Sequence, residues 1–476
     1  MRTKRCFVAL FSLVLPLCAA QFQNGQAAIA VIGQPSFSAR EAGINATALS
    51  ISTGRLYVAD TANHLLAFDL SKLAASGSAP SAILNQSVMV GISAVSVYGK
   101  SVAIADTVNH RVLVWRDASS ESALKGPDVV LADSSSVVEP ISVALDKQRL
   151  FVGDAALHRV LVWNTLPQSN NQAADVVLGQ PNFAASSVSD VPAANTVARP
   201  VALESDGERL FVADSTYRRI LVFAAADIPL PLNPVVNSAS LTPAPLAPGA
   251  LVTISAAGLT QASDAARDGA DEPLPKKLGG VEVILDGSAL PLLSVSPTEI
   301  HAQFPYDIIN RSSSSLFIRS EQEKGAVVTS NAVAVSLIPA SPGLFAFSGK
   351  EPRPGMALHG TSPVTANNPA HPGDAITLWG AGLGAVIAAE ASESGAVAGV
   401  PNAQPDSLVQ VPVTATVNGM PGEVLSAVIP QGSIGIYEVR ILLPRDFSVE
   451  GSATLAISQD GHQSNTITIP VKNGTQ

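Results

Sequence analysis

The sequence predicts an all-β protein in which a four-bladed β-propeller precedes two β-sandwiches. A motif of two short apolar strands, joined by a turn that opens with aspartate, occurs four times, with its aspartates at Asp60, Asp106, Asp154 and Asp214. A period of roughly 50 residues with several strands per repeat is typical of propeller blades. A second duplication fills the C-terminal half. Only 14% of the residues are charged, which suits a chain of many short strands.

The N-terminus has the pattern of a secretory signal peptide at residues 1–20. A basic start precedes an apolar run that is short for a membrane span and ends at Cys18-Ala-Ala20. Both cysteines, Cys6 and Cys18, lie in this segment, so we expect a mature chain without disulfides. Lipidation of Cys18 is an alternative, which the preceding Leu17 disfavours. We expect a secreted protein, extracellular or periplasmic, with no membrane span after cleavage.

The charge balance excludes one class of partner. The whole chain has a formal charge of −10, and removal of the basic leader makes it more negative. Binding to phosphates requires clustered Lys and Arg, so we expect no nucleic-acid partner. No motif predicts a cofactor.

The propeller is expected at residues 27–226. Each of the first three motifs has an inner strand before it and an outer strand after it, whereas the fourth runs into a proline-rich stretch that cannot form a central strand. A spare strand is present at the other end of the domain, at 28–32. We therefore expect this N-terminal strand to pair beside Leu221-Val-Phe223 and close the ring. A partial ring completed by a second copy is an alternative.

Two of the motifs resemble a known repeat. Val58-Ala-Asp-Thr-Ala-Asn-His64 and Ile104-Ala-Asp-Thr-Val-Asn-His110 are similar to NHL repeats, and the third and fourth copies are weaker. The resemblance implies a β-propeller, usually of six blades, so four copies is a departure. Members of this family bind protein or RNA, and some related propellers are lyases or lactonases, so the fold alone does not select a function.

The repeated histidines His64, His110 and His158 suggest a metal ring, but each opens the third strand outward from the axis. Strands lie about 4.8 Å apart, so these histidines cannot converge on one ion. We therefore expect repeat-wide Asp and His to hold the turns. The weak candidates for ligand binding are the non-repeated charges on the loops that enter the inner strands: Arg40, Glu41, Glu139 and Arg199.

The C-terminal half follows a proline-rich linker at 227–235 and contains two similar copies, expected at 236–340 and 341–472. Val281-Glu-Val-Ile-Leu-Asp-Gly287 matches Val413-Thr-Ala-Thr-Val-Asn-Gly419, and Ser330-Asn matches Ser464-Asn. Alternating strands of five to seven residues, bounded by Gly, Asn and Pro, indicate a β-sandwich for each copy.

This half resembles, through Val236-Asn-Ser-Ala-Ser240, Gln303-Phe-Pro305 and Pro372-Gly-Asp374, a tandem Ig-like module that recurs in secreted acidobacterial proteins. The resemblance implies two Ig-like domains and no established activity.

Two classes of function compete. The favoured one is a secreted, noncatalytic binding or scaffold protein, whose propeller loops contact a protein or carbohydrate and whose Ig-like pair is a spacer or envelope contact. The alternative is a metal-dependent, lactonase-like hydrolase or lyase. Such a site needs several ligands that point to one centre, and the inner strands offer only the nearby Glu139 and Glu204. We therefore expect no catalytic and no metal-binding residues.

Overall fold

The computed structural model contains β-strands and two 3-10 turns in its described part, η1 (Leu70–Lys72) and η2 (Thr107–Asn109). No helix in that part is long and apolar enough to cross a membrane. The expected signal peptide, with both cysteines, lies outside the described residues. These are 22–41, 43–44, 46–52, 55–60, 64–72, 77, 79, 82–85, 93–98, 101–116, 127–132, 137–231, 234–261, 263–266, 273–322, 325–387, 396–403, 406–446 and 451–473.

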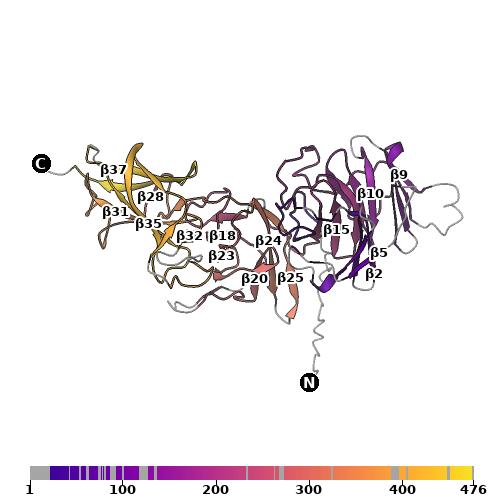
Figure 1. Ribbon diagram of the computed structural model, residues 1–476, viewed down its shortest axis with the longest axis horizontal. Helices are drawn as coiled ribbons and strands as arrows, with labels where there is room; N and C mark the ends of the chain where they lie inside the picture. The colour runs from indigo at the N-terminus through magenta and orange to yellow at the C-terminus, as the bar shows by residue number, and fades with distance from the viewer. Residues whose placement is uncertain are drawn as a thin grey trace, which may run out of the picture.

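The four sequence repeats form four separate antiparallel sheets of four strands each, which we call repeat sheets 1 to 4 (Figure 1). Their strands are β2 (Ala46–Ser52), β3 (Arg55–Asp60), β4 (His64–Asp69) and β5 (Ala82–Asn85); β6 (Ala94–Tyr98), β7 (Ser101–Asp106), β8 (Arg111–Trp115) and β9 (Val129–Leu131); β10 (Pro140–Leu145), β11 (Leu150–Asp154), β12 (Arg159–Trp163) and β13 (Val176–Leu178); β14 (Pro200–Ser205), β15 (Arg209–Asp214), β16 (Arg219–Ala224) and β1 (Ala30–Ile32).

The N-terminal strand supplies the outer strand of repeat sheet 4, as expected. It pairs antiparallel with β16, Ala30 opposite Val222 and Ile32 opposite Ile220. All three residues of β1 are fully buried. Because successive side chains of a strand point to opposite faces, Val31 enters the core shared with repeat sheet 3, while its two neighbours enter the core shared with repeat sheet 1.

The innermost strands of successive sheets pack against one another. β6 contacts β10, β10 contacts β14, and β14 contacts β2, with a separate apolar core between the sheets at each seam. For β2 and β6, which would complete a ring, the described residues give no comparable packing. The sheets therefore follow one another in the order 2, 3, 4, 1.

An aspartate precedes each of two outer strands, and its carboxylate binds the end of the neighbouring strand. Asp128 accepts a hydrogen bond from the backbone N–H of Arg116 at 2.8 Å. Asp175 accepts the equivalent bond from Asn164 at 2.7 Å. The two strands start at the following valines.

The C-terminal half has two further cores. In the first unit (234–337), two sheets face each other across one core: β17 (Val235–Asn237), β18 (Leu251–Ser255), β23 (Glu299–Gln303), β22 (Leu292–Val295) and β19 (Asp264–Ala265) form one. The other contains β21 (Ser288–Ala289), β20 (Val281–Leu285), β24 (Ser313–Glu321), β25 (Val327–Thr329) and β26 (Val333–Ser336).

In the second unit (343–473), the layers around the core are joined into one sheet. The long strand β35 pairs with β34 through Met420–Gly422 and then with β36 from Glu423 onward. The strands are β27 (Gly343–Leu344), β28 (Arg353–Pro354), β29 (Ala357–His359), β30 (Ser362–Pro363), β31 (Ala375–Ala381), β32 (Val386–Ile387), β33 (Ser407–Val409), β34 (Thr414–Val417), β35 (Met420–Ile429), β36 (Tyr437–Leu442), β37 (Gly451–Gln459), β38 (His462–Gln463) and β39 (Ile467–Val471).

The duplication of the C-terminal half extends to its hydrogen bonds. The hydroxyl of Ser330 accepts from the N–H of Ile318 and donates to the carbonyl of Asn331. Ser464 makes the same two bonds, with Ile457 and Asn465. Each asparagine side chain then holds the segment that enters its own unit: Asn331 accepts from the N–H of Leu230, and Asn465 from that of Leu344.

Direct hydrogen bonds join the parts of the chain into an elongated row (Figure 1). The N–H of Ala27 donates to the carbonyl of Ala332 at 2.7 Å, and that of Ser312 donates to the hydroxyl of Ser38 at 3.1 Å. At the other junction, the side chain of Asn237 donates to the carbonyls of Ser341 and Ala381 at 3.0 and 3.1 Å. Neither junction depends on a free linker.

Candidate functional site

In repeats 2 to 4, the aspartate and arginine that frame the repeat turn form ion pairs. Asp106 pairs with Arg111 at 2.7 Å, and Asp154 pairs with Arg159 at 3.3 Å. The Asp154 carboxylate also accepts backbone hydrogen bonds from the loop that enters the inner strand of the same sheet, at Val138 and Glu139. In repeats 3 and 4 the aspartate therefore anchors an incoming loop, and does not cap its own turn as the sequence suggested.

The repeated histidines connect neighbouring sheets. His110 Nδ1 donates to the carbonyl of Val138 at 2.7 Å, and His158 Nδ1 donates to that of Ala198 at 2.6 Å. Both acceptors lie on the loop that enters the next sheet. Both histidines have a left-handed backbone, with φ of 52° and 53°. For these two residues the expected structural role is confirmed, and the partner is the backbone of the adjacent repeat.

The two Gly-Gln-Pro motifs, at residues 33–35 and 179–181, fold their loops in the same way. Gln34 donates to the carbonyls of Arg218 and Glu41. Gln180 donates to the carbonyls of His158 and Ser187. Each glutamine thus fixes the left-handed residue of the preceding sheet and the carbonyl seven residues along its own loop.

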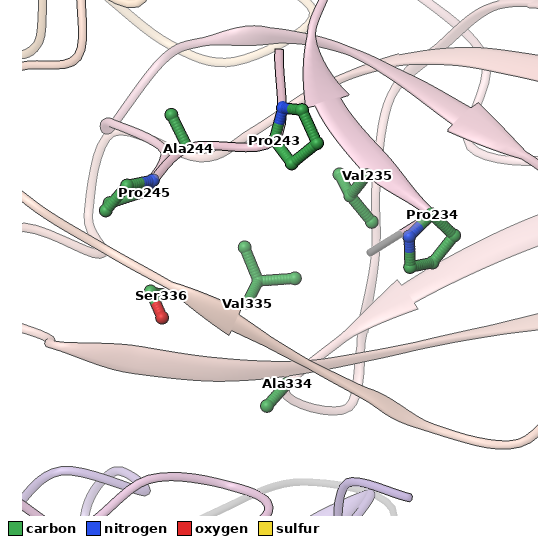
Figure 2. Close-up of a pocket in the computed structure, with 8 residues that line it drawn as sticks. All are labelled: Pro234, Val235, Pro243, Ala244, Pro245, Ala334, Val335 and Ser336. Atoms are coloured by element: carbon green, nitrogen blue, oxygen red, sulfur yellow. The ribbon is translucent and has the colours of Figure 1, made fainter. Parts of the chain in front are cut away.

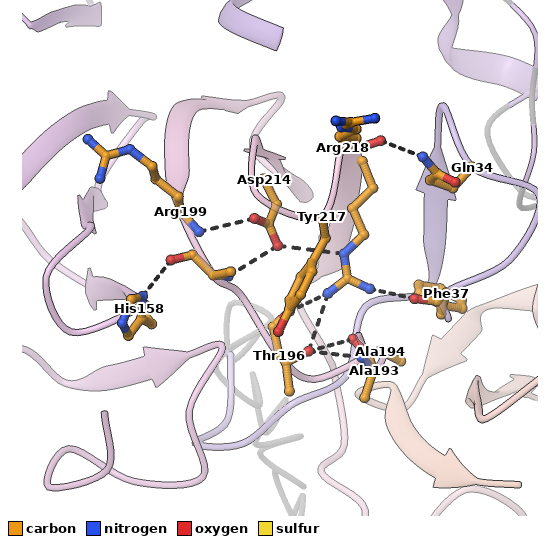
Figure 3. Close-up of polar contacts among 12 residues, drawn as sticks. Gln34, Phe37, His158, Ala193, Ala194, Thr196, Arg199, Asp214, Tyr217 and Arg218 are labelled. Atoms are coloured by element: carbon orange, nitrogen blue, oxygen red, sulfur yellow. Dashed lines mark hydrogen bonds and ion pairs between the residues drawn. The ribbon is translucent and has the colours of Figure 1, made fainter. Parts of the chain in front are cut away.

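A buried polar cluster lies between these loops in repeat sheet 4 (Figure 3). Asp214 and Arg219 are fully buried, with Nε and Oδ2 3.6 Å apart. Asp214 accepts from the N–H of Arg199, and Arg219 donates to the carbonyls of Phe37 and Thr196. Burial lowers the pKa of Arg219, and Asp214 opposes this change. The equivalent pairs in repeats 2 and 3 indicate that the cluster is structural.

Tyr217 distinguishes repeat 4 from the others. Its ring lies 4.9 Å from Arg219 Cζ and 5.1 Å from Arg40 Cζ, measured to the ring centroid. Its hydroxyl donates to the carbonyl of Ser189. Burial, and then the charge of Asp214, raise its pKa. Tyr217 therefore stays a neutral donor at neutral pH and holds the loop that contains Ser189.

The structure places the four sequence candidates in two pairs. Glu139 and Arg199 each precede the proline that opens an inner strand, and their side chains meet across adjacent sheets at 3.4 Å. Arg40 and the backbone of Glu41 contact Tyr217 and Gln34, respectively. Arg40 and Glu41 are exposed. The candidates are therefore loop charges on the same end of the sheets, without a common centre.

A second feature of these loops was not predicted from the sequence. The long loop, residues 179–199, exposes three apolar side chains, Phe183 at 40%, Val188 at 41% and Val191 at 52%. The repeat counterpart of Phe183 is Phe37, which is fully buried. We call the three exposed side chains the apolar patch. The motif alone could not reveal it, because both phenylalanines stand in the same local sequence.

Hydrogen bonds within the long loop, and one from Tyr217 of repeat sheet 4, hold the loop in place. Gln180 and Tyr217 donate to the carbonyls of Ser187 and Ser189. The side chain of Asn182 accepts from the two N–H groups after Phe183, and the N–H of Val191 donates to Ser189 Oγ. A loop fixed before binding loses less conformational freedom when a partner docks.

Two hollows lie outside the apolar patch. One, of about 210 Å³, is lined by prolines and small residues, and Ser336 supplies its only side-chain hydroxyl (Figure 2). The other, of about 690 Å³, lies in the C-terminal half against Pro35. Within the ranges described, no three His, Cys, Asp or Glu side chains are grouped so that they could hold a metal ion. Glu204, the other acidic candidate, lies in β14 opposite Phe211.

Comparison with known proteins gives only distant likenesses. No protein-family model matches the sequence, and no curated protein matches it. Among solved structures, the designed Ika4 protein is 15% identical, covers 41% of this chain and 96% of its own, and gives a TM-score of 0.19.

Two natural proteins are similarly remote. Sqt1 of Saccharomyces cerevisiae is 15% identical over 37% of this chain and 45% of its own, with a TM-score of 0.18. The Bacteroides ovatus protein SGBP-B, solved with a mixed-linkage heptasaccharide, is 12% identical over 56% and 52%, with a TM-score of 0.22.

Proposed function

We propose that this is a secreted, noncatalytic binding or scaffold protein. In it, a four-bladed NHL-type propeller presents a protein-binding loop, and two Ig-like domains act as a spacer. The observation that carries the proposal is the apolar patch. Phe183 is exposed where its repeat counterpart is buried, and two exposed valines accompany it on a fixed loop. Exposed apolar groups are a feature of contact surfaces, and these three side chains belong to one loop.

The composition of the loop end favours a protein partner over a carbohydrate. Aromatic residues and arginines are enriched in protein interfaces, and Arg40 is exposed beside the patch-bearing loop. Two of the three patch side chains are valines, which offer sugar hydroxyls neither a hydrogen bond nor a ring face for stacking. The hydrogen-bonded junctions at Ala332 and Asn237 support the spacer role, since they would hold the loop end at a fixed distance from the C-terminal unit.

The test compares capture of partners by three forms of the mature chain. The forms are wild type, a patch variant (Phe183→Ser, Val188→Ser, Val191→Ser) and a matched control (Phe347→Ser, Leu241→Ser, Val327→Ser). The control residues have comparable exposure and lie in the C-terminal half. Each form is cross-linked in the envelope and culture fluid of the source cells and analysed by mass spectrometry.

We expect at least one protein to cross-link within residues 179–199 of wild type and of the control, and to be lost from the patch variant. Equal capture by all three forms, or retention only on polysaccharide, would contradict protein binding through this loop. N-terminal sequencing of the exported form tests secretion separately, and a mature protein that begins at Met1 would overturn it.

A further inference from the structure

A cavity of about 690 Å³ lies where three stretches that are distant in sequence meet. Pro35 contributes from the loop after β1, and Lys276 and residues between 285 and 311 contribute from the first C-terminal unit. The second unit contributes residues 385–386, 396–398 and 410. Ligand sites of 300–1,000 Å³ occur preferentially at such junctions. Most of the lining is apolar, including Leu290, Ile309 and Val397, and the last two are exposed despite their apolar character.

One ion pair lies in this apolar lining. Arg311 Nη1 and Asp286 Oδ2 are 2.7 Å apart, and Asp286 is buried. The carboxylate also accepts from Ser314 Oγ and from the N–H of Ser315, so three hydrogen bonds fix its position. The other guanidinium donors of Arg311 make no hydrogen bond to any residue in the described ranges.

The second C-terminal unit provides an internal control for this pair. Asn418 is the counterpart of Asp286, and both have φ of 48° before a glycine. The amide oxygen of Asn418 accepts from the N–H and the hydroxyl of Thr454, at 2.7 and 3.0 Å. A neutral side chain therefore suffices to hold this turn. The turn does not explain the carboxylate and arginine of the first unit, whereas a cavity that needs a fixed donor does.

The charge of the lining limits the ligand. Its charged residues are two cations, Lys276 and Arg311, and two anions, Asp286 and Asp307. A wall with no net charge and mainly apolar atoms favours an uncharged ligand, because a net charge would lose its hydration without compensation. The N–H groups of Arg311 that bond to no described residue are free to donate to an acceptor on that ligand.

We propose that this cavity binds an uncharged apolar molecule through a carbonyl or hydroxyl oxygen that accepts a hydrogen bond from Arg311. Asp286 is a positioning residue that fixes the guanidinium. The site is separate from the apolar patch, so it stands or falls independently of the proposed protein-binding function.

The test uses Nile red, a neutral dye with a ring carbonyl, titrated against the full mature chain by fluorescence. Wild type is expected to bind one dye per chain with blue-shifted emission. Ala289→Trp and Ala396→Trp fill the cavity and are each expected to weaken binding at least tenfold. Val327→Trp, on β25 outside the lining, is the matched control and should bind like wild type.

The double variant Asp286→Asn, Arg311→Met removes the guanidinium donor. The introduced asparagine can still hold its turn with the same kind of bonds that Asn418 makes in the second unit. The double variant should weaken binding about tenfold, as loss of a hydrogen bond from a charged donor does, with an unchanged urea transition. The proposal is overturned if the dye does not saturate, or if both tryptophan variants, shown to be folded, bind like wild type. If the anionic dye anilinonaphthalene sulfonate bound more tightly than Nile red, and if this binding depended on Arg311, the inference that the ligand is uncharged would be overturned.

Discussion

Strand β1 is expected to stabilise the whole repeat region, and Ile32→Ala tests this. The Ile32 side chain is fully buried in the core between repeat sheets 4 and 1, together with Phe211 and Ile220. Truncation of a buried isoleucine to alanine costs about 2–5 kcal/mol, because it removes apolar contacts and leaves a cavity. For a domain of this size, about 3 kcal/mol lowers the melting temperature by roughly 6–12 °C.

The assay is urea unfolding of the mature chain, combined with native-state hydrogen exchange. Val31→Ala is the companion variant, since Val31 faces the other core, shared with repeat sheet 3. We expect both variants to lower the stability of β14–β16 as well as that of β1. If faster exchange were confined to the N–H groups of β1 and the global transition stayed unchanged, the strand would be a loosely attached end, and its stabilising role would be refuted.

Three more predictions concern single contacts. Asp214→Ala should lower the free energy of unfolding in urea by about 3–5 kcal/mol. The reason is that the variant leaves the buried Arg219 without its counter-ion. A loss below about 1 kcal/mol would show that the ion pair is not needed for stability. Asn331→Ala removes the acceptor of the Leu230 N–H and should lower the free energy of unfolding by about 1–3 kcal/mol. The distance distribution from small-angle X-ray scattering should broaden. An unchanged distribution would contradict the role of Asn331 in holding the segment that contains Leu230. Burial raises the pKa of Tyr306 to about 12. The protonated hydroxyl therefore contributes to the free energy of unfolding below pH 10, and this contribution is lost as pH rises through 12. In an absorbance titration, Tyr306→Phe should lack one late phenolate step that wild type shows; identical titration curves would disprove the prediction.

The repeat register predicted much of the fold. The missing fourth outer strand correctly indicated that residues near 30 pair with β16. The Glu139–Arg199 contact could also have been predicted, because both residues precede the proline of an inner strand in consecutive repeats. Equivalent positions of adjacent sheets meet along the seam, although they are 60 residues apart in sequence.

Other features depend on packing that a local pattern does not encode. The sequence does not show that Asp154 and Asp214 bind loops fifteen or sixteen residues upstream. Nor does it separate Phe37 from Phe183. Ser38, next to Phe37, is bonded to Ser312 of the C-terminal half, whereas the described residues give no such bond beside Phe183. The burial of Phe37 thus involves the C-terminal half, whose Ala332 belongs to the same apolar core.

The duplications give a physical criterion for separating structure from function in this chain. Where two copies make the same bonds with the same residues, as Ser330 and Ser464 do, the repeat itself explains the residue. Where one copy departs at a cost, a further cause is required. An exposed phenylalanine gives up its burial energy, and a buried carboxylate with its arginine gives up hydration, although Asn418 makes the same turn without that loss. At Phe183 and at the pair Asp286–Arg311, binding of a partner or ligand would account for the energetic cost. The binding experiments are therefore directed at these positions.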